Sequence, residues 1–469
     1  MKIIHTLLIV VLIASAAWCQ IEVYETQKET SLRITRGRDL QWSSNDRTAN
    51  AVLTVDVDSN KQYQPIIGWG GAFTEASAHV FKQLNPQVQD EVMEAYFGPN
   101  GLNYTLCRTH MNSCDFSLEN YSCDNTTGDF ALENFNINRD LRYIVPLIKL
   151  AQRKKPSLKW FFTPWSPPAW MKGNGKMDET SKPGLIWKDQ YKKTWALFFH
   201  KFIQAYKKQG IEFWGVTVQN EPEAITSWDT CYYSKEEERD FVRDYLGPLL
   251  RQNYPDLKIM IWDHNRDNIF EWAKTILGDE ETAKYVDGTA FHWYVDNLYE
   301  NVQKTYETYP NKFVLASEAC HCPGVKLYDY ERGELYARDI IHDLNAGSGG
   351  WIDWNILLDS VGGPNHVGNF CDAPLVKDKD QQKIHYQFTY YHLGHFTKFM
   401  QVDGKRIFSK VSDRTDKVYS AAVLNPDGRV SLVIQNMSDE DFDVKIQDGS
   451  RTAVATIAAH SIKTFRYQK

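Results

Sequence analysis

Between residues 65 and 400, short apolar runs alternate with longer amphipathic segments. The segment 191–209, for example, places Trp195, Phe198, Phe202 and Tyr206 near helical spacing, as expected of a helix with one buried face. Short apolar runs that alternate with helical segments are typical of repeated βα units. The candidate strands are 65–73, 103–109, 158–164, 213–219, 257–262, 286–292, 312–317 and 350–355. Eight βα units closed on themselves form a TIM (β/α)8 barrel, so the pattern predicts an α/β fold.

After residue 400 the pattern changes to short alternating strands separated by turns. The runs 418–424 and 430–435 flank the turn residues Asn-Pro-Asp-Gly, which predicts a hairpin. The run 51–57 also alternates and places Leu53, Val55 and Val57 on one strand face. We therefore predict an accessory all-β sandwich built from residues 20–64 and 401–469, on either side of a barrel over residues 65–400. The alternative for the N-terminal segment is a free arm.

The first residues have the pattern of a secretory signal peptide. Lys2 precedes an apolar run from Ile3 to Trp18 that ends in small residues, which predicts a signal over residues 1–19. A membrane anchor is the alternative, but the run is shorter than the ~20 residues that a spanning helix needs, and no later run is long enough. We therefore expect no transmembrane segment in the mature chain. Glycan acceptors lie on exposed surface, and the candidates are Asn103, Asn120, Asn125 and Asn436.

The cysteines are expected to form disulfides if the chain is secreted. An oxidising compartment favours such bonds, and the chain has 8 Cys. Cys114 with Cys123, and Cys322 with Cys371, are both candidate pairs. Residues 320–322 read Cys-His-Cys but lack the second paired element of the usual zinc spacings, so we expect no metal site.

Composition narrows the class of partner. A net charge of -7 gives no broad basic surface, so nucleic-acid binding is excluded. The chain has 15 Trp and 25 Tyr, which suit stacking on sugar rings; an aromatic-rich core is the alternative. We expect no cofactor.

Polar and aromatic residues follow most of the predicted barrel strands. In a TIM barrel the functional side chains come from the carboxyl ends of the strands. The residues at these ends include Asp115, Trp165, Asn220, Glu221, Asp263, His264, Trp293, Tyr294, Glu318 and Trp354. Stability alone does not require so many of them on one rim, so we expect the active site there.

Two of these rim residues, Glu221 and Glu318, suit glycoside hydrolysis. Retaining glycosidases use two carboxyl groups about 5 Å apart, one as the nucleophile and the other as a general acid and then a base. Each Glu lies within three residues of the end of a buried run, so both are expected at the barrel mouth. Asn220 could bind the sugar 2-hydroxyl. Glu223 is the alternative to Glu221, but Asn220 before Glu221 and Pro222 after it favour Glu221.

Several short motifs carry these rim residues. In chain order they are Gly68–Thr74, Ser113–Ser117, Pro164–Trp170, Gln219–Pro222, His292–Tyr294, Ala316–Cys320, Trp351–Asn355 and Tyr391–Phe396. Taken together the chain resembles glycoside hydrolase family 30, most closely its glucosylceramidase branch. The resemblance covers the chain from about Arg36 to the C-terminus, and the joint occurrence of so many motifs is highly specific.

The resemblance implies a role for each matching residue. It implies that Glu318 is the nucleophile and Glu221 the acid/base. It further implies that His292 and Tyr294 lie beside these carboxylates and that the glucose pocket is lined by Asp115, Trp165, Asn220, Trp354 and Asn369. We expect Tyr294 to keep Glu318 ionised by hydrogen bonding, and the charge of Glu318 to raise the pKa of Glu221.

The resemblance also implies a substrate, partners and a location. It implies hydrolysis of glucosylceramide, or a related β-glucoside, to glucose and ceramide, in a lysosome or after secretion. A saposin-like activator and an anionic lipid surface are the implied partners. Two departures affect the mouth: the loop 222–231 is shorter, and His366 stands where the vertebrate enzyme has Trp. A polysaccharide-cleaving glycosidase and a catalytically silent sugar-binding protein are the alternatives; intact Glu221 and Glu318 argue against the second.

Overall fold

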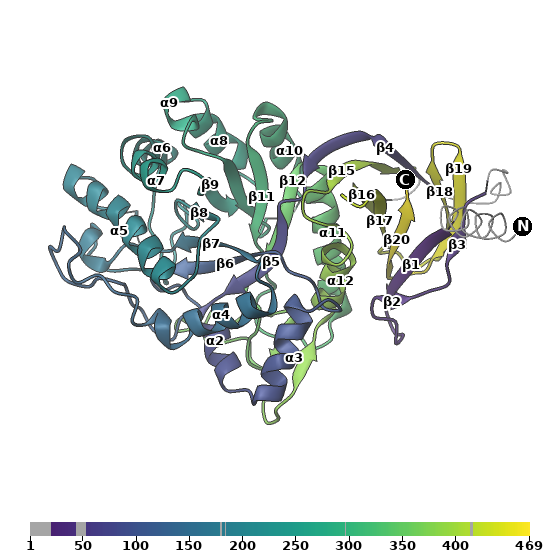
Figure 1. The fold of residues 1–469 in the computed structure, drawn as a ribbon, viewed down its shortest axis with the longest axis horizontal. Helices are drawn as coiled ribbons and strands as arrows, with labels where there is room; N and C mark the ends of the chain where they lie inside the picture. Colours follow the sequence, from purple (N-terminus) through teal and green to yellow (C-terminus); the bar gives the residue numbers. More distant parts are fainter. Residues whose placement is uncertain (1–19, 44–52, 179–180, 183, 296, 413–415) are drawn as a thin grey trace, which may run out of the picture. The chain divides into compact units, whose positions relative to one another are not determined.

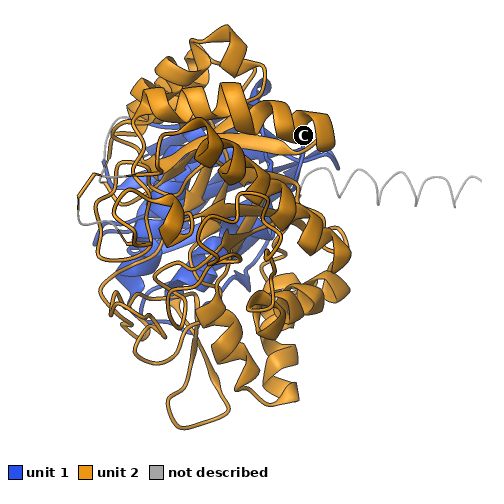
Figure 2. Cartoon of the chain, turned by 90° about the vertical axis from the view of Figure 1, so that its left-hand side faces the viewer, with its two compact units in different colours: residues 1–67, 329–345, 388–469 blue, residues 68–328, 346–387 orange. Residues whose placement is uncertain are grey.

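The structure is a computed structural model that describes residues 20–43, 53–178, 181–182, 184–295, 297–412 and 416–469. The predicted signal peptide, residues 1–19, lies outside the described residues. The chain divides into two compact units (Figure 2). One comprises residues 1–67, 329–345 and 388–469, and the other comprises residues 68–328 and 346–387. Among the described residues, no helix combines the length and apolar character needed to cross a bilayer.

The second unit is the predicted barrel (Figure 1). Parallel strands close it in sequence order, because the last strand pairs with the first. They are β5 (Gly68–Phe73), β6 (Leu106–Met111), β7 (Lys159–Pro164), β8 (Gly215–Thr217), β9 (Lys258–Asn265), β10 (Gly288–His292), β11 (Phe313–Glu318) and β12 (Ser348–Asp353). Their residues are almost all buried, on both strand faces, which is why most of them read as largely apolar runs. All the predicted barrel strands are therefore confirmed.

Helices connect the barrel strands. They are α2 (Glu75–Lys82), α3 (Pro86–Phe97), α4 (Ile144–Lys154), α5 (Asp189–Lys208), α6 (Lys235–Phe241), α7 (Gly247–Asn253), α8 (Ile269–Leu277), α9 (Glu280–Ala283) and α10 (Tyr299–Thr308). Short turns of 3-10 or π helix lie at η1 (Asp140–Arg142), η2 (Ala169–Met171) and η3 (Val242–Leu246), and a hairpin of β13 (Leu375–Lys377) and β14 (Ile384–Tyr386) follows β12. Helix α5 buries the aromatic stripe that predicted it, including Trp195 and Phe202.

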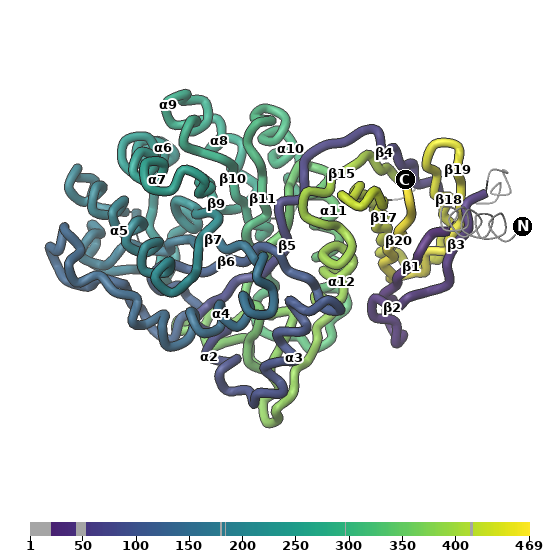
Figure 3. The backbone as a smooth tube through the Cα atoms, in the orientation of Figure 1, coloured from purple at the N-terminus to yellow at the C-terminus, as the bar shows by residue number. Residues whose placement is uncertain are grey.

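The other unit holds the predicted β-sandwich. Its strands are β1 (Gln20–Gln27), β2 (Thr35–Arg36), β3 (Leu40–Gln41), β4 (Leu53–Pro65), β15 (Lys405–Val411), β16 (Val418–Leu424), β17 (Arg429–Asn436), β18 (Phe442–Asp448), β19 (Arg451–Ile457) and β20 (Ser461–Gln468). The N-terminal strands pair with C-terminal ones: β1 with β20, and β4 with β15 and β18 (Figure 3). The N-terminal segment is therefore part of the sandwich and not a free arm. The same unit includes α11 (Tyr330–Asn345) and α12 (Phe388–Thr397).

Alternation along the strands produces the core of this unit. Leu53, Val55 and Val57, the face predicted from the sequence, are buried with Ile434 and Phe465. The intervening residues of β4 are more exposed. A period of two therefore places one face of each strand in the core.

Of the two candidate disulfides, one is present. Cys322 and Cys371 form a disulfide, whereas Cys114 and Cys123 are free thiols. The predicted pairing of Cys114 with Cys123 is therefore wrong. Both free thiols are buried and pack as small apolar side chains.

The expected glycan at Asn436 conflicts with the structure. This residue is fully buried, and its Nδ2 donates to the carbonyl oxygens of Glu440, Ile457 and Ala458 at 2.7, 3.2 and 3.0 Å. A glycan on Nδ2 would disrupt these hydrogen bonds. The other acceptor sites, exposed at Asn120 and Asn125 and half-buried at Asn103, stay predictions.

Candidate active site

A cavity of about 330 Å³ opens where the carboxyl ends of the barrel strands meet. Glu221 and Glu318 both line it. So do the predicted substrate-binding residues Asp115, Trp165, Asn220, Tyr294, Trp354 and Asn369. His292, which ends β10, contacts both carboxylates. The structure thus brings all the predicted catalytic and substrate-binding residues together.

The backbone aims the two carboxylates from different strands. Glu318 is the last residue of β11, and Glu221 lies in the turn after β8. Glu221 has a φ of +46°, in the left-handed region that non-glycine residues rarely adopt. Its N–H donates to the carbonyl oxygen of Asp263 at 3.0 Å, and the N–H of Asn220 donates to that of Pro164 at 2.9 Å. Neighbouring strand ends therefore hold Glu221 in this conformation, as is common at functional sites.

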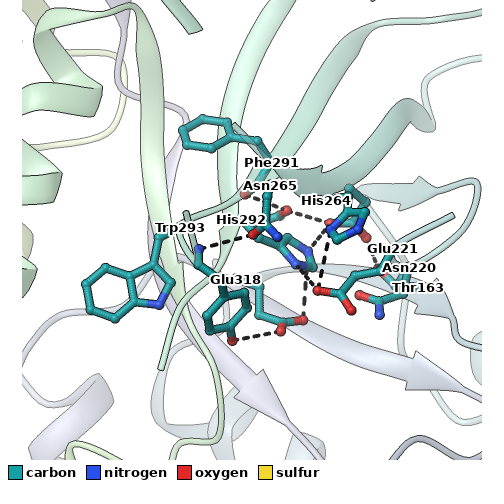
Figure 4. Close-up of polar contacts among 12 residues, drawn as sticks. Thr163, Asn220, Glu221, His264, Asn265, Phe291, His292, Trp293 and Glu318 are labelled. Carbon is teal, nitrogen blue, oxygen red and sulfur yellow. Dashed lines mark hydrogen bonds and ion pairs between the residues drawn. The ribbon is translucent and has the colours of Figure 1, made fainter. Parts of the chain in front are cut away.

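One imidazole ring joins the two carboxylates (Figure 4). His292 Nδ1 lies 3.2 Å from Glu221 Oε1, and its Nε2 lies 3.8 Å from Glu318 Oε2 and 3.0 Å from Asp263 Oδ1. Burial opposes charge on His292, but Glu318, Asp263 and Glu221 together raise its pKa to about 9. The ring is therefore a cation in acid and neutral solution.

The cation at His292 reverses the expected order of the pKa values of Glu221 and Glu318. Burial favours a high pKa for Glu221, but His264, 3.6 Å from its Oε1, and His292 lower that pKa below its ordinary value. Burial raises the pKa of Glu318, although His292 and Arg108 partly oppose it. The expectation that Glu221 has the raised pKa is therefore not met in the free protein. That expectation rested on repulsion between the two carboxylates, whereas the imidazolium beside them has the larger effect on Glu221.

Arg108 is a central residue of the site that sequence reasoning did not identify. Its guanidinium donates to Glu318 Oε2 at 2.6 Å, to Asp263 Oδ2 at 2.9 Å and to Asn220 Oδ1 at 2.9 Å. The side chain is fully buried in the middle of β6. The signal in the sequence is a charged residue inside a predicted barrel strand, which must find a partner because an unpaired buried charge is costly.

Glu318 has a second donor on its other oxygen. The hydroxyl of Tyr294 donates to Glu318 Oε1 at 2.9 Å, as expected from the sequence, and also lies 3.2 Å from Cys320 Sγ. With Arg108 on Oε2, both carboxylate oxygens are held in fixed positions. Such double fixation can orient a carboxylate for nucleophilic attack.

One side of the cavity has a carboxylate and two stacked indoles. Asp115 Oδ2 accepts hydrogen bonds from Nδ2 of Asn365 at 3.2 Å and of Asn369 at 3.1 Å. Burial is the main cause that raises the pKa of Asp115 to about 7. The rings of Trp165 and Trp354 stack with centroids 5.1 Å apart. A polar group that faces sugar hydroxyls beside aromatic faces is typical of a sugar-binding pocket.

Two groups of side chains each bring potential metal ligands within 4.8 Å of one another. They are Glu221 with His264 and His292, and Cys320 with Cys322 and Cys371. In the first, both nitrogens of His292 already face carboxylates. In the second, two of the sulfur atoms are joined in the disulfide. As arranged, neither group resembles the closed tetrahedral sites of structural zinc.

Comparison with known families gives matches over most of the chain. Residues 66–400 match the model of the glycosyl hydrolase family 30 TIM-barrel domain. Residues 403–465 match the family's beta sandwich domain.

Several curated proteins are similar along nearly their whole length. A Caenorhabditis elegans protein named putative glucosylceramidase 4 is 37% identical over 90% of this chain and 85% of its own length. The mouse lysosomal acid glucosylceramidase is 36% identical over 92% of this chain and 88% of its own. An endo-1,6-β-D-glucanase of Aspergillus fumigatus is 27% identical over 84% of this chain and 83% of its own.

Solved structures show the same architecture. SrfJ of Salmonella typhimurium superposes with a TM-score of 0.91 and 31% identity, covering 96% of this chain and 100% of its own. An endo-β-1,6-glucanase superposes with a TM-score of 0.85 and 27% identity, covering 96% of this chain and 99% of its own.

Proposed function

The chain belongs to glycosyl hydrolase family 30, and from this premise we propose that it is a retaining β-glucosidase that hydrolyses glucosylceramide to glucose and ceramide. The observation that carries the proposal is the pair of rim carboxylates, Glu221 and Glu318, in contact with one imidazole at the cavity. Similarity to glucosylceramidases over about 90% of the chain supports the choice of substrate.

In the first step Glu318 attacks the anomeric carbon. Arg108 and Tyr294 orient its oxygens, and a glucosyl ester forms as the bond to the ceramide oxygen breaks. The leaving oxygen takes a proton from Glu221. In the free protein this proton rests on His292, whose Nδ1 faces Glu221. When substrate excludes water, transfer from Nδ1 to Glu221 leaves a neutral ring that still donates from Nε2 to Asp263.

In the second step water hydrolyses the glucosyl ester on Glu318. Loss of charge on Glu318 removes one cause of the high pKa of His292, and Glu221 accepts a proton from the attacking water. The oxygen of water bonds to the anomeric carbon on the face that ceramide left, and Glu318 departs as a carboxylate. Two inversions give net retention of the β configuration.

A lipid substrate requires contact with a membrane surface. Large apolar side chains are exposed on loops that follow β8, β11 and β12, namely Ile225, Leu327, Tyr328, Val361, Val367 and Phe370. Exposed apolar surface of this kind is typical of sites that contact a membrane or a partner. These residues support peripheral binding to an anionic lipid surface, assisted by a saposin-like activator, in an acidic compartment of the secretory pathway.

A second candidate is an endo-β-1,6-glucanase. Two observations favour it: the similarity to a fungal endo-1,6-β-D-glucanase and the high structural similarity to a solved endo-β-1,6-glucanase. The carboxylates would perform the same chemistry, and only the leaving group would differ. The identity to glucosylceramidases is higher, so glucosylceramide is the first choice.

A substrate panel tests the proposal. The purified chain is incubated at acid pH with glucosylceramide in anionic vesicles and, separately, with β-1,6-glucan, and ceramide and oligosaccharides are measured. We expect ceramide and glucose, with activity reduced at least about 1,000-fold in Glu318→Gln. Oligosaccharides without ceramide would establish the second candidate, whereas inactivity on every β-glucoside would overturn the glycosidase assignment.

A further inference from the structure

The loop after β12, residues 354–374, holds the carboxylate of Asp115 in the sugar pocket. In addition to the two Nδ2 hydrogen bonds from Asn365 and Asn369, the backbone N–H of His366 donates to the carbonyl oxygen of Asp115 at 3.1 Å. We call this segment the β12 loop. The position of Asp115 therefore depends on what holds the β12 loop in place.

The side chain of His366 ties the β12 loop to two other loops. Its Nδ1 lies 3.3 Å from the carbonyl oxygen of Ser117, in the loop after β6. Its Nε2 forms an ion pair with Oδ2 of Asp229, at 3.3 Å, in the loop after β8. Asp229 is itself fully buried and accepts hydrogen bonds from Ser113 Oγ and Asn120 Nδ2. One ring thus joins three of the loops that form the barrel mouth.

The surroundings of His366 favour its charged form. Both ring nitrogens face acceptors, and only the cation has an N–H on each. Burial opposes the charge, but Asp229 outweighs burial and raises the pKa of His366. Asp115 is the other acidic group that acts on the ring, and it favours the cation only when it is itself ionised, since its pKa is raised to about 7.

Two further titratable groups, His110 and Cys114, lie near Asp229, and neither replaces His366 as its ion-pair partner. The Nε2 of His110 accepts the backbone N–H of Glu75 at 3.1 Å, which leaves no proton on that nitrogen, and burial lowers the pKa of His110. Burial likewise raises the pKa of the Cys114 thiol well above its ordinary value, so the thiol stays protonated. Asp229, whose pKa is lowered despite burial by His366 and Ser113, remains a carboxylate with His366 as its cationic partner.

We propose that His366 is a positioning residue for the glucose pocket, which fixes the β12 loop through Asp229 so that Asn365 and Asn369 hold Asp115 for sugar binding in acid solution. The inference rests on the proposed function, since it takes the Asp115 pocket to receive the sugar. His366 is not among the residues that line the cavity, whereas Asp115 and Asn369 are. It acts through them, and loss of its charge loosens the pocket as the pH rises.

The test compares KM across pH in the wild type and in His366→Gln. Gln keeps a donor and similar length but cannot carry the charge. With a soluble aryl β-glucoside, we expect the ratio of KM in His366→Gln to KM in the wild type to be about five- to tenfold near pH 5 and to approach one near pH 8.5, with kcat within about twofold. A purely structural role would give a ratio that does not change with pH, and that result would overturn the inference.

Matched variants make the result specific. Asp229→Asn should give the same pH-dependent ratio, and the double variant should add little to either single change. His460→Gln is the control, because its ring also lies between two carboxylates, those of Glu334 and Asp439 at 3.0 Å each, but in the other unit. Its KM ratio should stay near one at every pH.

Two outcomes separate this inference from the proposed function. If the wild type hydrolyses no β-glucoside, the proposed function fails. If the wild type is active but the KM ratio is flat, only the role of His366 fails. Thermal unfolding of each variant is measured first; should His366→Gln not fold, Asp229→Asn alone tests the same ion pair, and a flat ratio in that variant contradicts the inference.

Discussion

Single residues of the site titrate together and not one by one. His292 lies between Glu221, Glu318 and Asp263, so a proton on any one of them changes the pKa of the others. Arg108 adds a fixed positive charge that keeps Asp263 ionised and its pKa well below the usual range, although burial opposes ionisation. The proton that departs with the leaving group therefore belongs to the pair of His292 and Glu221.

Replacement of Glu221 by Gln should separate the two chemical steps. Release of an alkoxide such as ceramide needs a proton, so turnover of glucosylceramide should fall about 10²- to 10⁴-fold. An aryl glucoside with a good leaving group should still transfer glucose to Glu318 and give a burst of phenol. Added azide, which needs no general base, should restore turnover and yield β-glucosyl azide, identified by its anomeric proton signal.

Glu223 supplies the matched control for this experiment. It is the neighbouring carboxylate that the sequence left as the alternative, and its Oε2 accepts a hydrogen bond from Asn268 at 2.8 Å. Glu223→Gln should keep nearly full turnover of glucosylceramide and show no response to azide. A large loss and azide rescue in Glu223→Gln, with an active Glu221→Gln, would reverse the assignment.

Elements that are buried on both faces were the easiest to predict. Most barrel strands appear as largely apolar runs, and the predicted bounds lie within a few residues of the observed ones. The start of β5 was predicted at residue 65, but Pro65 ends β4, a sandwich strand that pairs there with Lys405. Residues 65–67 read Pro-Ile-Ile and run directly into β5, so the pattern does not show where the sandwich strand ends and the barrel strand begins.

The rim residues were predictable because a barrel places strand ends together. Trp165, Asn220 and Trp354 each follow an apolar run, and all three line the cavity. Arg108 was missed because it lies inside a strand, where its partners come from other strands far away in the sequence. The link from His366 to Asp229 was missed for the same reason, since it joins two loops 137 residues apart in number (366 minus 229).

The disulfide should matter for substrate binding as well as for stability. It joins the loop after β11 to the β12 loop, and Cys371 lies two residues from Asn369, which contacts Asp115. The double variant Cys322→Ser/Cys371→Ser frees a segment closed over a sequence separation of 49, which should lower the free energy of unfolding by about 2–4 kcal/mol. KM for an aryl β-glucoside should rise while kcat changes less.

Reductant provides the control for the disulfide prediction. Mild reduction of the wild type should reproduce the rise in KM, and the double variant should not respond to reductant. An unchanged KM in the folded double variant would show that the β12 loop keeps its position without the bond. A further rise in the double variant on reduction would point to a different cystine among the remaining thiols.

Over the whole molecule, buried carboxyls and buried histidines change the free energy of unfolding in opposite directions below about pH 6.5. Burial, as the main cause, raises the pKa of Asp115 and Asp140 to about 7 and that of Glu238 to about 8. In this range the folded chain binds more protons at these groups than the unfolded chain, so they favour the folded state in acid. Burial lowers the pKa of His110 and His395, which charge on unfolding and act in the opposite direction.

Above about pH 6.5 the histidines no longer offset the carboxyls, so the free energy of unfolding should fall as the pH rises. The histidines with lowered pKa are then neutral in both states, whereas Asp140, Glu238 and His292 still hold protons only when folded and release them by about pH 9. We expect the free energy of unfolding, measured by denaturant titration, to drop by on the order of a few kcal/mol between about pH 6.5 and 8.5.

The variant Asp140→Asn tests one contribution to this drop. The hydroxyls of Tyr121 and Tyr206 donate to the side-chain oxygens of Asp140 at 2.8 Å, and Asn, like the protonated acid, carries no charge there. This variant should become more stable relative to the wild type as the pH rises, and a difference that stays constant with pH would contradict the account.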